Sequence, residues 1–465
     1  MNQSLLAEFA SRGVEQLHRD DPALYELLDQ EYQRQTGVLA MVAASSIASP
    51  SVLACEGTVL SNVTTEGYPG ARFHAGCKIV DEIERLAIRR ACEAFGAQYA
   101  NVQPHSGSSA NEIVMFNLLK PDDTIMGLDL NSGGHLTHGS KASVSGRYFN
   151  AVGYSLNEEG FLDYERIRRL AQEQRPKLII SGASAYPRTI DFKRFREIAD
   201  EVGAYLLADI SHIAGLVVAG LHPSPIDHAH FTTTSTYKQL FGPRGGLILL
   251  GKDHESLAPD GNQTLAEMMQ RAVFPFFQGT PNLNTIAAKA RALAMVTTPK
   301  FKAVAYRIVN AAAALAEALL ERGYVVLTAG SDNHIVLVDV AARGLTGVVV
   351  ERALEECNII VNKNRIAGDR KSAMITSGMR LGTNSLALRG MSGAEMPLCA
   401  DLIHRTLTAV KMFGEADYEL DNFTRSAVRA DVSELCQKFP IPYYPSPAVE
   451  DAAYEQPYLL VQQQA

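Results

Sequence analysis

The stretch Thr232-Thr233-Thr234-Ser235-Thr236-Tyr237-Lys238 leads into the loop Gln239-Leu240-Phe241-Gly242-Pro243-Arg244-Gly245-Gly246, and an apolar run follows over 247–250. This stretch delivers a lysine from the hydroxyl-rich end of a strand into a glycine-rich loop. A buried ammonium must be paired, shift its pKa or react. A reactive lysine condenses with an aldehyde cofactor, whose phosphate is held by hydroxyls and backbone N–H groups. From this stretch alone, a surface lysine that follows an edge strand is as good an interpretation as a reactive lysine.

A carboxylate stands before this lysine in the run Ala204-Tyr205-Leu206-Leu207-Ala208-Asp209-Ile210-Ser211-His212. The run is typical of a buried strand, and the ends of such strands open onto the ligand crevice of an α/β sheet. Pyridoxal phosphate needs an acid there, because an Asp opposite the pyridine nitrogen keeps it protonated and lets the ring accept electrons. An Asp that only caps the next turn is the alternative. Lys238 and Asp209 together favour the cofactor.

The composition is that of an ordinary globular protein of 465 residues, with 46% apolar residues, 20% charged residues and a net charge of −8. The length allows two or three domains. The acidic balance argues against nucleic acid or an anionic membrane as a partner. No apolar run approaches about 18 residues, and the N-terminus lacks the pattern of a signal peptide. We therefore expect a cytoplasmic protein without a membrane span.

The six cysteines are scattered without CxxC spacing, which favours reduced thiols over disulfides or a zinc site. His135 and His138 have the spacing of a metal-binding pair. No acidic residue or cysteine accompanies them in the sequence, so we expect no metal.

The order of the predicted elements indicates four segments. Residues 1–40 have helical apolar spacing. Strands and helices alternate over 41–295, which predicts a large domain with a mostly parallel sheet covered by helices on both faces. An alanine-rich helix then opens a smaller α+β domain over 296–440. The Pro-, Tyr- and Gln-rich segment 441–465 is expected to be an extended tail.

Three further stretches have the composition of a ligand site. Ser106-Gly107-Ser108 precedes an apolar helix, whose N-terminus would hold an anion such as phosphate, although a plain N-cap serine is the alternative. Arg380 is framed by glycines and suits a bidentate grip on a substrate carboxylate, with a surface ion pair as the alternative. The loop 64–76 combines an acid, an arginine, aromatic residues and a histidine, which is typical of a site.

Four blocks of the sequence resemble the serine (glycine) hydroxymethyltransferase family of fold-type I pyridoxal phosphate enzymes, within a similarity over about residues 25–440. The blocks are Glu66-Gly67-Tyr68-Pro69-Gly70, Asn101-Val102-Gln103-Pro104-His105-Ser106-Gly107-Ser108, Gly133-Gly134-His135-Leu136-Thr137-His138-Gly139 and Gly242-Pro243-Arg244-Gly245-Gly246. The resemblance implies a large domain with a mostly parallel sheet of the seven-stranded type and a smaller C-terminal α+β domain. It also implies a homodimer or a dimer of dimers with shared active sites.

The same resemblance implies roles in cofactor binding. Lys238 would form the Schiff base, Asp209 would bind the pyridine nitrogen, and His135 would stack on the ring. Ser184 and His212 would lie near the phenolic oxygen of the cofactor. The phosphate would be held by Ser106, Gly107, Ser108 and Ser235, with Gln278 and Gly279 contributed by a second subunit.

Substrate-side roles follow from the resemblance in the same way. Arg380 would hold the substrate carboxylate, and Glu66 would be the acid/base that manages the β-hydroxyl proton. Other residues placed beside the substrate are His74, Thr64 and Tyr237. Tetrahydrofolate would lie near Phe73, Leu130, Gly134, Leu136 and Asn364.

The sequence departs from the family pattern mainly on the substrate side. The family's Ser-Glu-Asn-Tyr is here Ala44-Ser45-Ser46-Ile47, which removes a serine that helps to hold the substrate carboxylate. Other replacements are Thr64 for a tyrosine, Phe73-His74 for a pair of tyrosines, Tyr237 for a histidine, and Thr280 for a glycine of the phosphate loop. This pattern indicates an altered substrate or reaction.

We expect an enzyme that makes or breaks the Cα–Cβ bond of a β-hydroxy-α-amino acid, with tetrahydrofolate as the one-carbon acceptor. Its substrate is serine (or glycine) or a bulkier relative, because Thr64 and Ala44 leave space beside it. Three alternatives remain open: a folate-independent aldolase or transaldolase, a pyridoxal phosphate-dependent decarboxylase or oxidase of a specialised amino acid, and a non-catalytic binding relative. The presence of Lys238, Asp209 and Arg380 speaks against the last.

Overall fold

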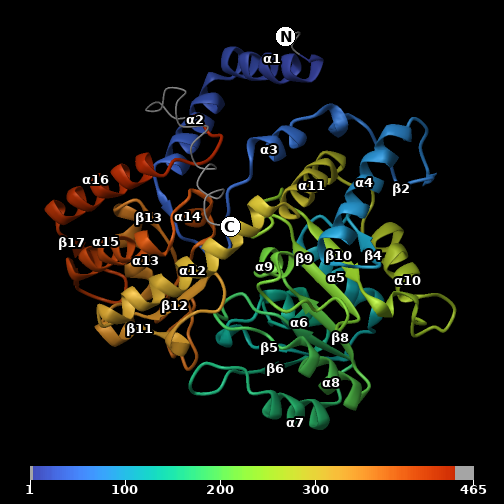
Figure 1. The fold of residues 1–465 in the computed structure, drawn as a ribbon. Coiled ribbons are helices and arrows are strands. Elements are labelled where there is room, and N and C mark those ends of the chain that lie inside the picture. Colours follow the sequence, from blue (N-terminus) through green and yellow to red (C-terminus); the bar gives the residue numbers. More distant parts are fainter. Residues whose placement is uncertain (1–3, 446–465) are drawn as a thin grey trace.

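A seven-stranded sheet forms the centre of the protein, of which the computed structural model describes residues 4–445 (Figure 1). Its order is β4 (Tyr99–Asn101), β10 (Gly246–Leu250), β9 (Phe231–Ser235), β8 (Tyr205–Asp209), β7 (Leu178–Ser181), β5 (Thr124–Leu128) and β6 (Asn150–Tyr154). Only β10 runs antiparallel to its neighbours in this sheet. The prediction of a mostly parallel sheet is confirmed.

The register of the central strands gathers polar residues at one edge of this sheet. Asp209 is the last residue of β8 and lies opposite Thr233 of β9. Ser235 ends β9 and pairs with Gly246 at the start of β10. Because β7, β8 and β9 are parallel, their carboxyl ends meet at the same edge, where an α/β sheet binds its ligands.

Helices cover both faces of the sheet, which explains why the central strands are buried along their whole length. They include α4 (Lys78–Phe95), α5 (Gly107–Leu118), α7 (Tyr164–Gln174), α8 (Phe192–Val202), α9 (Ala214–Ala219), α10 (Leu265–Arg271) and α11 (Leu283–Val296). Helix α8 buries its apolar stripe, is capped by Asp191 and ends at Gly203, whose positive φ of 69° favours glycine. Helix α4 ends in the same way at Gly96, whose φ is 67°.

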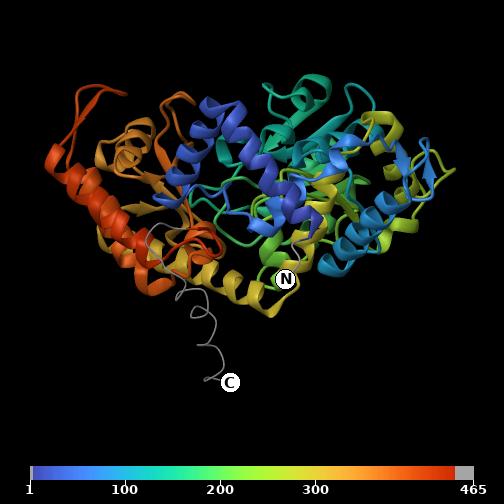
Figure 2. The same ribbon diagram turned by 90° about the horizontal axis from the view of Figure 1, so that it is seen from above.

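A four-stranded antiparallel sheet forms a second core. Its order is β11 (Val325–Val326), β12 (Ile335–Asp339), β15 (Gly378–Gly382) and β14 (Asn362–Asn364), and it packs with α13 (Gly347–Glu356), α15 (Met396–Thr408) and α16 (Asn422–Lys438). Arg380 is the middle residue of β15. Helix α12 (Pro299–Glu321) joins the two cores, because Phe301 packs in the first and Leu319 in the second. Figures 1 and 2 show this helix running between the two parts.

Helix α12 is also the one helix within residues 4–445 that is long and apolar enough to cross a membrane. Half of its most apolar window is buried inside the protein. Core helices of globular proteins meet the same criterion, and the positions of Phe301 and Leu319 make α12 such a helix.

The N-terminal segment consists of α1 (Leu5–Asp20) and α2 (Pro22–Thr36), neither of which has a buried residue. Helix α1 extends away from the rest of the chain and exposes Leu5, Leu6 and Phe9 (Figure 1). After α2, strand β1 (Leu39–Ala40) pairs with β13 (Ile359–Ile360) beside the smaller sheet. The predicted boundaries between the four segments stay predictions, and residues 446–465 of the expected tail lie outside the described part. All six cysteines are unpaired, as expected.

Candidate active site

A cavity of about 150 Å³ opens at the carboxyl edge of the seven-stranded sheet and contains the Lys238 side chain. The residues predicted to bind the cofactor within one chain all line this cavity. The lining consists of Ser106, Gly107, Ser108, His135, Ala183, Ser184, Asp209, Ser211, His212, Ser235, Tyr237, Lys238, Arg244 and Gly245. Residues from far apart in the sequence therefore meet around one lysine.

Lys238 is almost fully buried, with 6% of its surface exposed. Burial lowers the pKa of its amine to about 8, although the negative charge of Asp209 opposes this shift. Its Nζ atom has no hydrogen-bond partner among residues 4–445. A lysine whose amine loses its proton near neutral pH is a good nucleophile toward an aldehyde.

Asp209 is held as a carboxylate by three donors. Asn111 Nδ2 lies 2.8 Å and His138 Nε2 lies 3.1 Å from its Oδ2 atom, and the Ser211 backbone N–H donates to Oδ1 at 3.0 Å. Burial alone would raise the pKa of Asp209, but the hydrogen bond and charge of His138 outweigh burial and hold this pKa well below its usual range. A permanently ionised acid is what a protonated pyridine nitrogen requires. Asn111 and His138 were not predicted as site residues.

His135 presents a neutral ring to the same cavity. Burial lowers the pKa of its imidazole to about 4, and its Nδ1 atom lies 2.8 Å from Thr137 Oγ1. The ligand atoms of His135, His138 and Asp209 lie within 4.8 Å of one another, in an arrangement that could hold a metal ion. No acid stands beside the two histidines in the sequence, but the fold brings Asp209 to them from another strand. The donors to Asp209 account for its position without a metal ion.

His212 packs behind this group, on a second buried histidine. Its Nδ1 atom lies 3.4 Å from His334 Nε2, and the two rings stack with their centroids 5.6 Å apart. Burial lowers the pKa of both rings, to about 3 for His334. The two imidazoles are therefore neutral and add no positive charge to the cavity.

The turn 106–108 fits a phosphate group. Ser106 caps the 12-residue helix α5, with its Oγ accepting from Ser109 N at 3.0 Å. A Cβ atom on Gly107 would lie 3.1 Å from Ser235 N and 3.2 Å from Ser211 Oγ, so a side chain there would crowd both groups. Ser235 Oγ is buried and has no partner within residues 4–445. A helix N-terminus and an unsatisfied hydroxyl together form a site for an anion.

Comparison with known proteins agrees with this geometry. A family model described as serine hydroxymethyltransferase matches residues 17–403. A serine hydroxymethyltransferase of Rickettsia canadensis (strain McKiel) is 46% identical over 425 residues, which cover 91% of this chain and 98% of that protein. The chain belongs to the serine hydroxymethyltransferase family. It is therefore a pyridoxal phosphate-dependent transferase of fold type I, and the predictions of this cofactor and of tetrahydrofolate are confirmed.

Arg380, which the family resemblance places at the substrate carboxylate, adjoins the cavity from the smaller sheet. Its Nε atom donates to Asn362 Oδ1 at 3.1 Å, and its Nη1 atom donates to the carbonyl of Ser184, which lines the cavity. Burial lowers the pKa of its guanidinium to about 10, and the nearby Tyr237 phenol opposes this shift. Within residues 4–445 no acidic side chain pairs with Arg380, so the surface ion pair considered from the sequence is absent there.

The predicted residues of the loop 64–76 do not reach the cavity of Lys238 in this chain. Arg72 is buried and anchors the loop, donating to Asp81 Oδ1 at 2.9 Å, to Glu84 and to the carbonyl of Gly67 at 2.8 Å. Glu66 lies on this loop, beside Gly279. Thr64, Phe73 and His74 belong to the same loop and likewise do not line the cavity.

Gln278 and Gly279 also stay outside the cavity of Lys238. Gln278 braces the phosphate turn from behind, because its Oε1 atom accepts from His105 N at 3.1 Å and its Nε2 atom donates to Gln103 O at 3.1 Å. The contribution of Gln278 and Gly279 to a second subunit's site stays a prediction of the family resemblance.

Most of the residues expected near folate in the hydroxymethyltransferase pattern come together. Leu130 and Leu136 flank one loop and are exposed. The side chain of Arg365 donates to Asn131 Oδ1, which joins this loop to the strand that ends at Asn364. A Cβ atom on Gly134 would collide with the carbonyl of Leu128, so glycine is required. Phe73 is the exception, because its ring packs on Phe274 instead.

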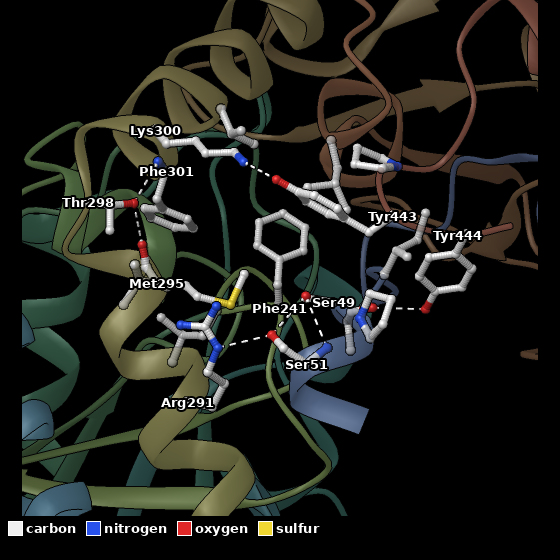
Figure 3. Close-up of a pocket in the computed structure, with 18 of the residues that line it drawn as sticks. Ser49, Ser51, Phe241, Arg291, Met295, Thr298, Lys300, Phe301, Tyr443 and Tyr444 are labelled. Carbon is white, nitrogen blue, oxygen red and sulfur yellow. Dashed lines mark hydrogen bonds between the residues drawn. The ribbon is translucent and has the colours of Figure 1, made fainter. Parts of the chain in front are cut away.

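A larger cavity of about 560 Å³ lies behind the lysine loop (Figure 3). It is lined by Leu240 and Phe241, by α3 (Pro50–Glu56) and the α11–α12 corner, and by Pro442–Tyr444. Arg291 Nε donates to Ser51 Oγ at 3.0 Å across its floor. Sequence reasoning did not predict this cavity, and it contains none of the residues assigned to the family's chemistry.

Proposed function

We propose that this enzyme transfers a hydroxymethyl group between serine, or a bulkier β-hydroxy-α-amino acid, and tetrahydrofolate. The observation that carries the proposal is the buried Lys238 with a pKa near 8, beside a permanently ionised Asp209 and a phosphate-sized turn. Pyridoxal phosphate bound there supplies an electron sink for the bond that breaks at Cα. Neither comparison supports the aldolase, decarboxylase, oxidase or non-catalytic alternatives.

The cofactor contacts proposed for this chain follow from its own polar groups. Lys238 provides the amine that binds the cofactor aldehyde, and Asp209 keeps the proton on the pyridine nitrogen. The neutral ring of His135 would pack on the cofactor face, while Ser184 and His212 would lie at its phenolic oxygen. The phosphate occupies the turn formed by Ser106, Gly107, Ser108 and Ser235. All of these residues line the cavity of Lys238.

The substrate carboxylate is proposed to bind Arg380, whose two-pronged guanidinium suits a carboxylate. Tyr237 stands beside it, with its ring centroid 4.1 Å from the Arg244 guanidinium carbon and 5.4 Å from Lys238 Nζ. The Tyr237 phenol also opposes the lowering of the Arg380 pKa, so the two side chains lie near each other.

The segment Ala43–Ser46 connects these two residues. Ala43 packs so closely on Gly382 of the arginine strand that a Cβ there would lie 2.4 Å from Ala43 Cα. Ser46 Oγ donates to the carbonyl of Tyr237. Ala44, which replaces the family's carboxylate-binding serine, lies in the segment between these two contacts. We propose that the Tyr237 hydroxyl replaces the missing serine hydroxyl.

The β-hydroxyl proton is proposed to pass to Glu66 of a second subunit. In that reaction the β-hydroxyl oxygen would become a carbonyl and its proton would go to the Glu66 carboxylate, while bound pyridoxal phosphate would take up the electron pair of the Cα–Cβ bond. The one-carbon unit then passes to tetrahydrofolate near Leu130, Gly134 and Asn364. A homodimer is supported by the position of Glu66 outside its own chain's cavity, and by the exposed apolar side chains of α1.

A cytoplasmic location, without nucleic acid or membrane partners, is part of the proposal. It is supported by the net charge of −8 and by six unpaired cysteines, a state that a reducing compartment maintains.

The test incubates the holoenzyme with serine, with and without tetrahydrofolate, and follows glycine, aldehyde, carbon dioxide and oxygen. Glycine that forms only with tetrahydrofolate supports the proposal. Free aldehyde formed equally without folate would show an aldolase instead, and carbon dioxide release or oxygen uptake would show a decarboxylase or an oxidase. If serine gives no product, a series of β-hydroxy amino acids with larger side chains identifies the substrate, and failure of the whole series overturns the proposal.

A further inference from the structure

A fully buried lysine of α11, Lys289, lies outside the catalytic cavity but close to it. Only 1% of its surface is exposed. Its Nζ atom donates to the carbonyls of Val102 at 2.7 Å, Pro104 at 2.9 Å and Gly246 at 2.9 Å. Burial lowers the pKa of this amine to about 7, although the negative charge of Glu84 opposes the shift. The charged amine has three N–H donors, which match these three carbonyls, so all three hydrogen bonds form only in the charged state.

The three carbonyls belong to the point where two strands separate. Strand β4 pairs with β10 only as far as Asn101 opposite Ile248. Beyond it, Pro104 has no N–H group to donate, so regular pairing cannot continue toward the phosphate turn. Lys289 donates hydrogen bonds to the carbonyls of Val102 and Pro104 on the first strand's side and of Gly246 on the second strand's side. Gln278 Nε2 donates to the carbonyl of Gln103, which lies between Val102 and Pro104 in the chain. Side chains therefore hold the segment that runs directly into Ser106.

The two glycines of the Gly-Pro-Arg-Gly-Gly loop fit this arrangement closely. A Cβ atom on Gly245 would lie 2.3 Å from Lys289 Cε, and a Cβ atom on Gly246 would lie 2.2 Å from the carbonyl oxygen of Ser106. Gly246 N also donates to the Pro104 carbonyl at 2.9 Å. The lysine, the glycine pair and the phosphate turn thus interlock, and the glycine pair leaves room for the buried lysine.

We propose that Lys289 is a positioning residue for the cofactor phosphate. Its bonds fix the backbone before Ser106, so that the N–H groups of the turn point at the phosphate before the cofactor arrives. The inference rests on the proposed phosphate-binding role of Ser106, Gly107 and Ser108. It gives Lys289 no contact with the substrate and no role in the chemistry at Lys238.

The test compares pyridoxal phosphate with pyridoxal, which lacks the phosphate, as ligands of the apoenzyme. Lys289→Met keeps the length and packing of the side chain but removes all three hydrogen bonds. Its affinity for pyridoxal phosphate is expected to fall by about tenfold or more, a loss of about 1.4 kcal/mol, while its affinity for pyridoxal stays within about twofold. The matched control is Lys302→Met on the exposed side of α12, which should change neither affinity.

An equal loss of both affinities would reduce Lys289 to a general structural role, and unchanged affinities would also overturn the proposal. If Lys289→Met does not fold, Gly245→Ala takes its place in the test. The added Cβ atom displaces the Lys289 side chain but keeps its charge, so the same selective loss of affinity for pyridoxal phosphate is expected. Ser106→Ala separates the two proposals. If it leaves the ratio of the two affinities unchanged, the proposed phosphate site fails, whereas a shifted ratio in Ser106→Ala but not in Lys289→Met refutes only the positioning role.

Discussion

The two halves of the proposed active site are built in different ways. In the cofactor half, strand ends of one chain deliver Lys238 and Asp209 into a buried cavity. The other half, the loop that carries Glu66, is anchored by Arg72 at a separate place and does not reach that cavity. Most departures from the family pattern fall on this loop or on the substrate side of the cavity. The interior thus fixes the cofactor chemistry, while more exposed segments leave the substrate open to change.

The strongest test of the cofactor half is Lys238→Ala. Without the amine the cofactor is no longer bound covalently, and turnover is expected to fall by about a thousandfold or more. Steady-state kinetics and the absorbance of the bound cofactor measure both effects, with Lys302→Met as the control. Turnover that stays near the wild-type rate would refute the role of Lys238.

The loop half is tested by Glu66→Gln, which keeps the shape of the side chain but removes its basicity. Turnover is expected to fall by about a hundredfold or more, with unchanged affinity for pyridoxal phosphate. If the two halves come from different subunits, refolding this variant together with Lys238→Ala restores about a quarter of the sites. A mixture that stays inactive, despite forming mixed dimers, would place both groups in one subunit's site.

The boundary between the halves is tested at Tyr237. Removing the hydroxyl in Tyr237→Phe is expected to weaken amino-acid binding by about tenfold to a hundredfold, because a hydrogen bond to a charged group is lost. Equilibrium titration of the holoenzyme with glycine measures this loss. Adding Ala44→Ser to Tyr237→Phe should recover most of the affinity. A double variant as weak as Tyr237→Phe would contradict the proposed exchange of hydroxyls.

The smallest expected effect is a pH dependence that belongs to the cofactor half alone. Because burial lowers the pKa of Lys238 to about 8, the reactive neutral amine grows from a small fraction to nearly all of the population as pH rises. The rate at which the apoenzyme captures pyridoxal phosphate should therefore rise by about tenfold between about pH 7 and pH 9, and then level off. Stopped-flow absorbance measures the rate. A rise that continues beyond about pH 10 would indicate an unshifted lysine.

Local sequence signals predicted the parts of the fold that depend on neighbours in the chain. The Ser106 turn before α5 and the glycine-rich loop after Lys238 each lie within one short stretch of sequence. These features follow from periodicity and turn chemistry, which are visible in a single stretch.

Contacts set by the order of the strands were harder to predict. Asn111 and His138 reach Asp209 only because the sheet places their elements beside β8. Lys289 sits in an alanine-rich helix, where a single lysine normally indicates an exposed face. Its burial depends on the gap after β4, which no local pattern reveals. The separation of Glu66 from Lys238 likewise depends on how distant elements pack, and no local pattern in the sequence reveals it.

The smaller sheet carries two of the proposed binding functions on neighbouring strands. Asn364 pairs with Gly378 and Asn362 with Arg380, so the folate-side residue and the carboxylate-binding arginine belong to one rigid unit. A rotation of this sheet would move both residues together. If both ligands favour the same orientation of the sheet, each raises the affinity for the other by the same factor, as thermodynamic linkage requires.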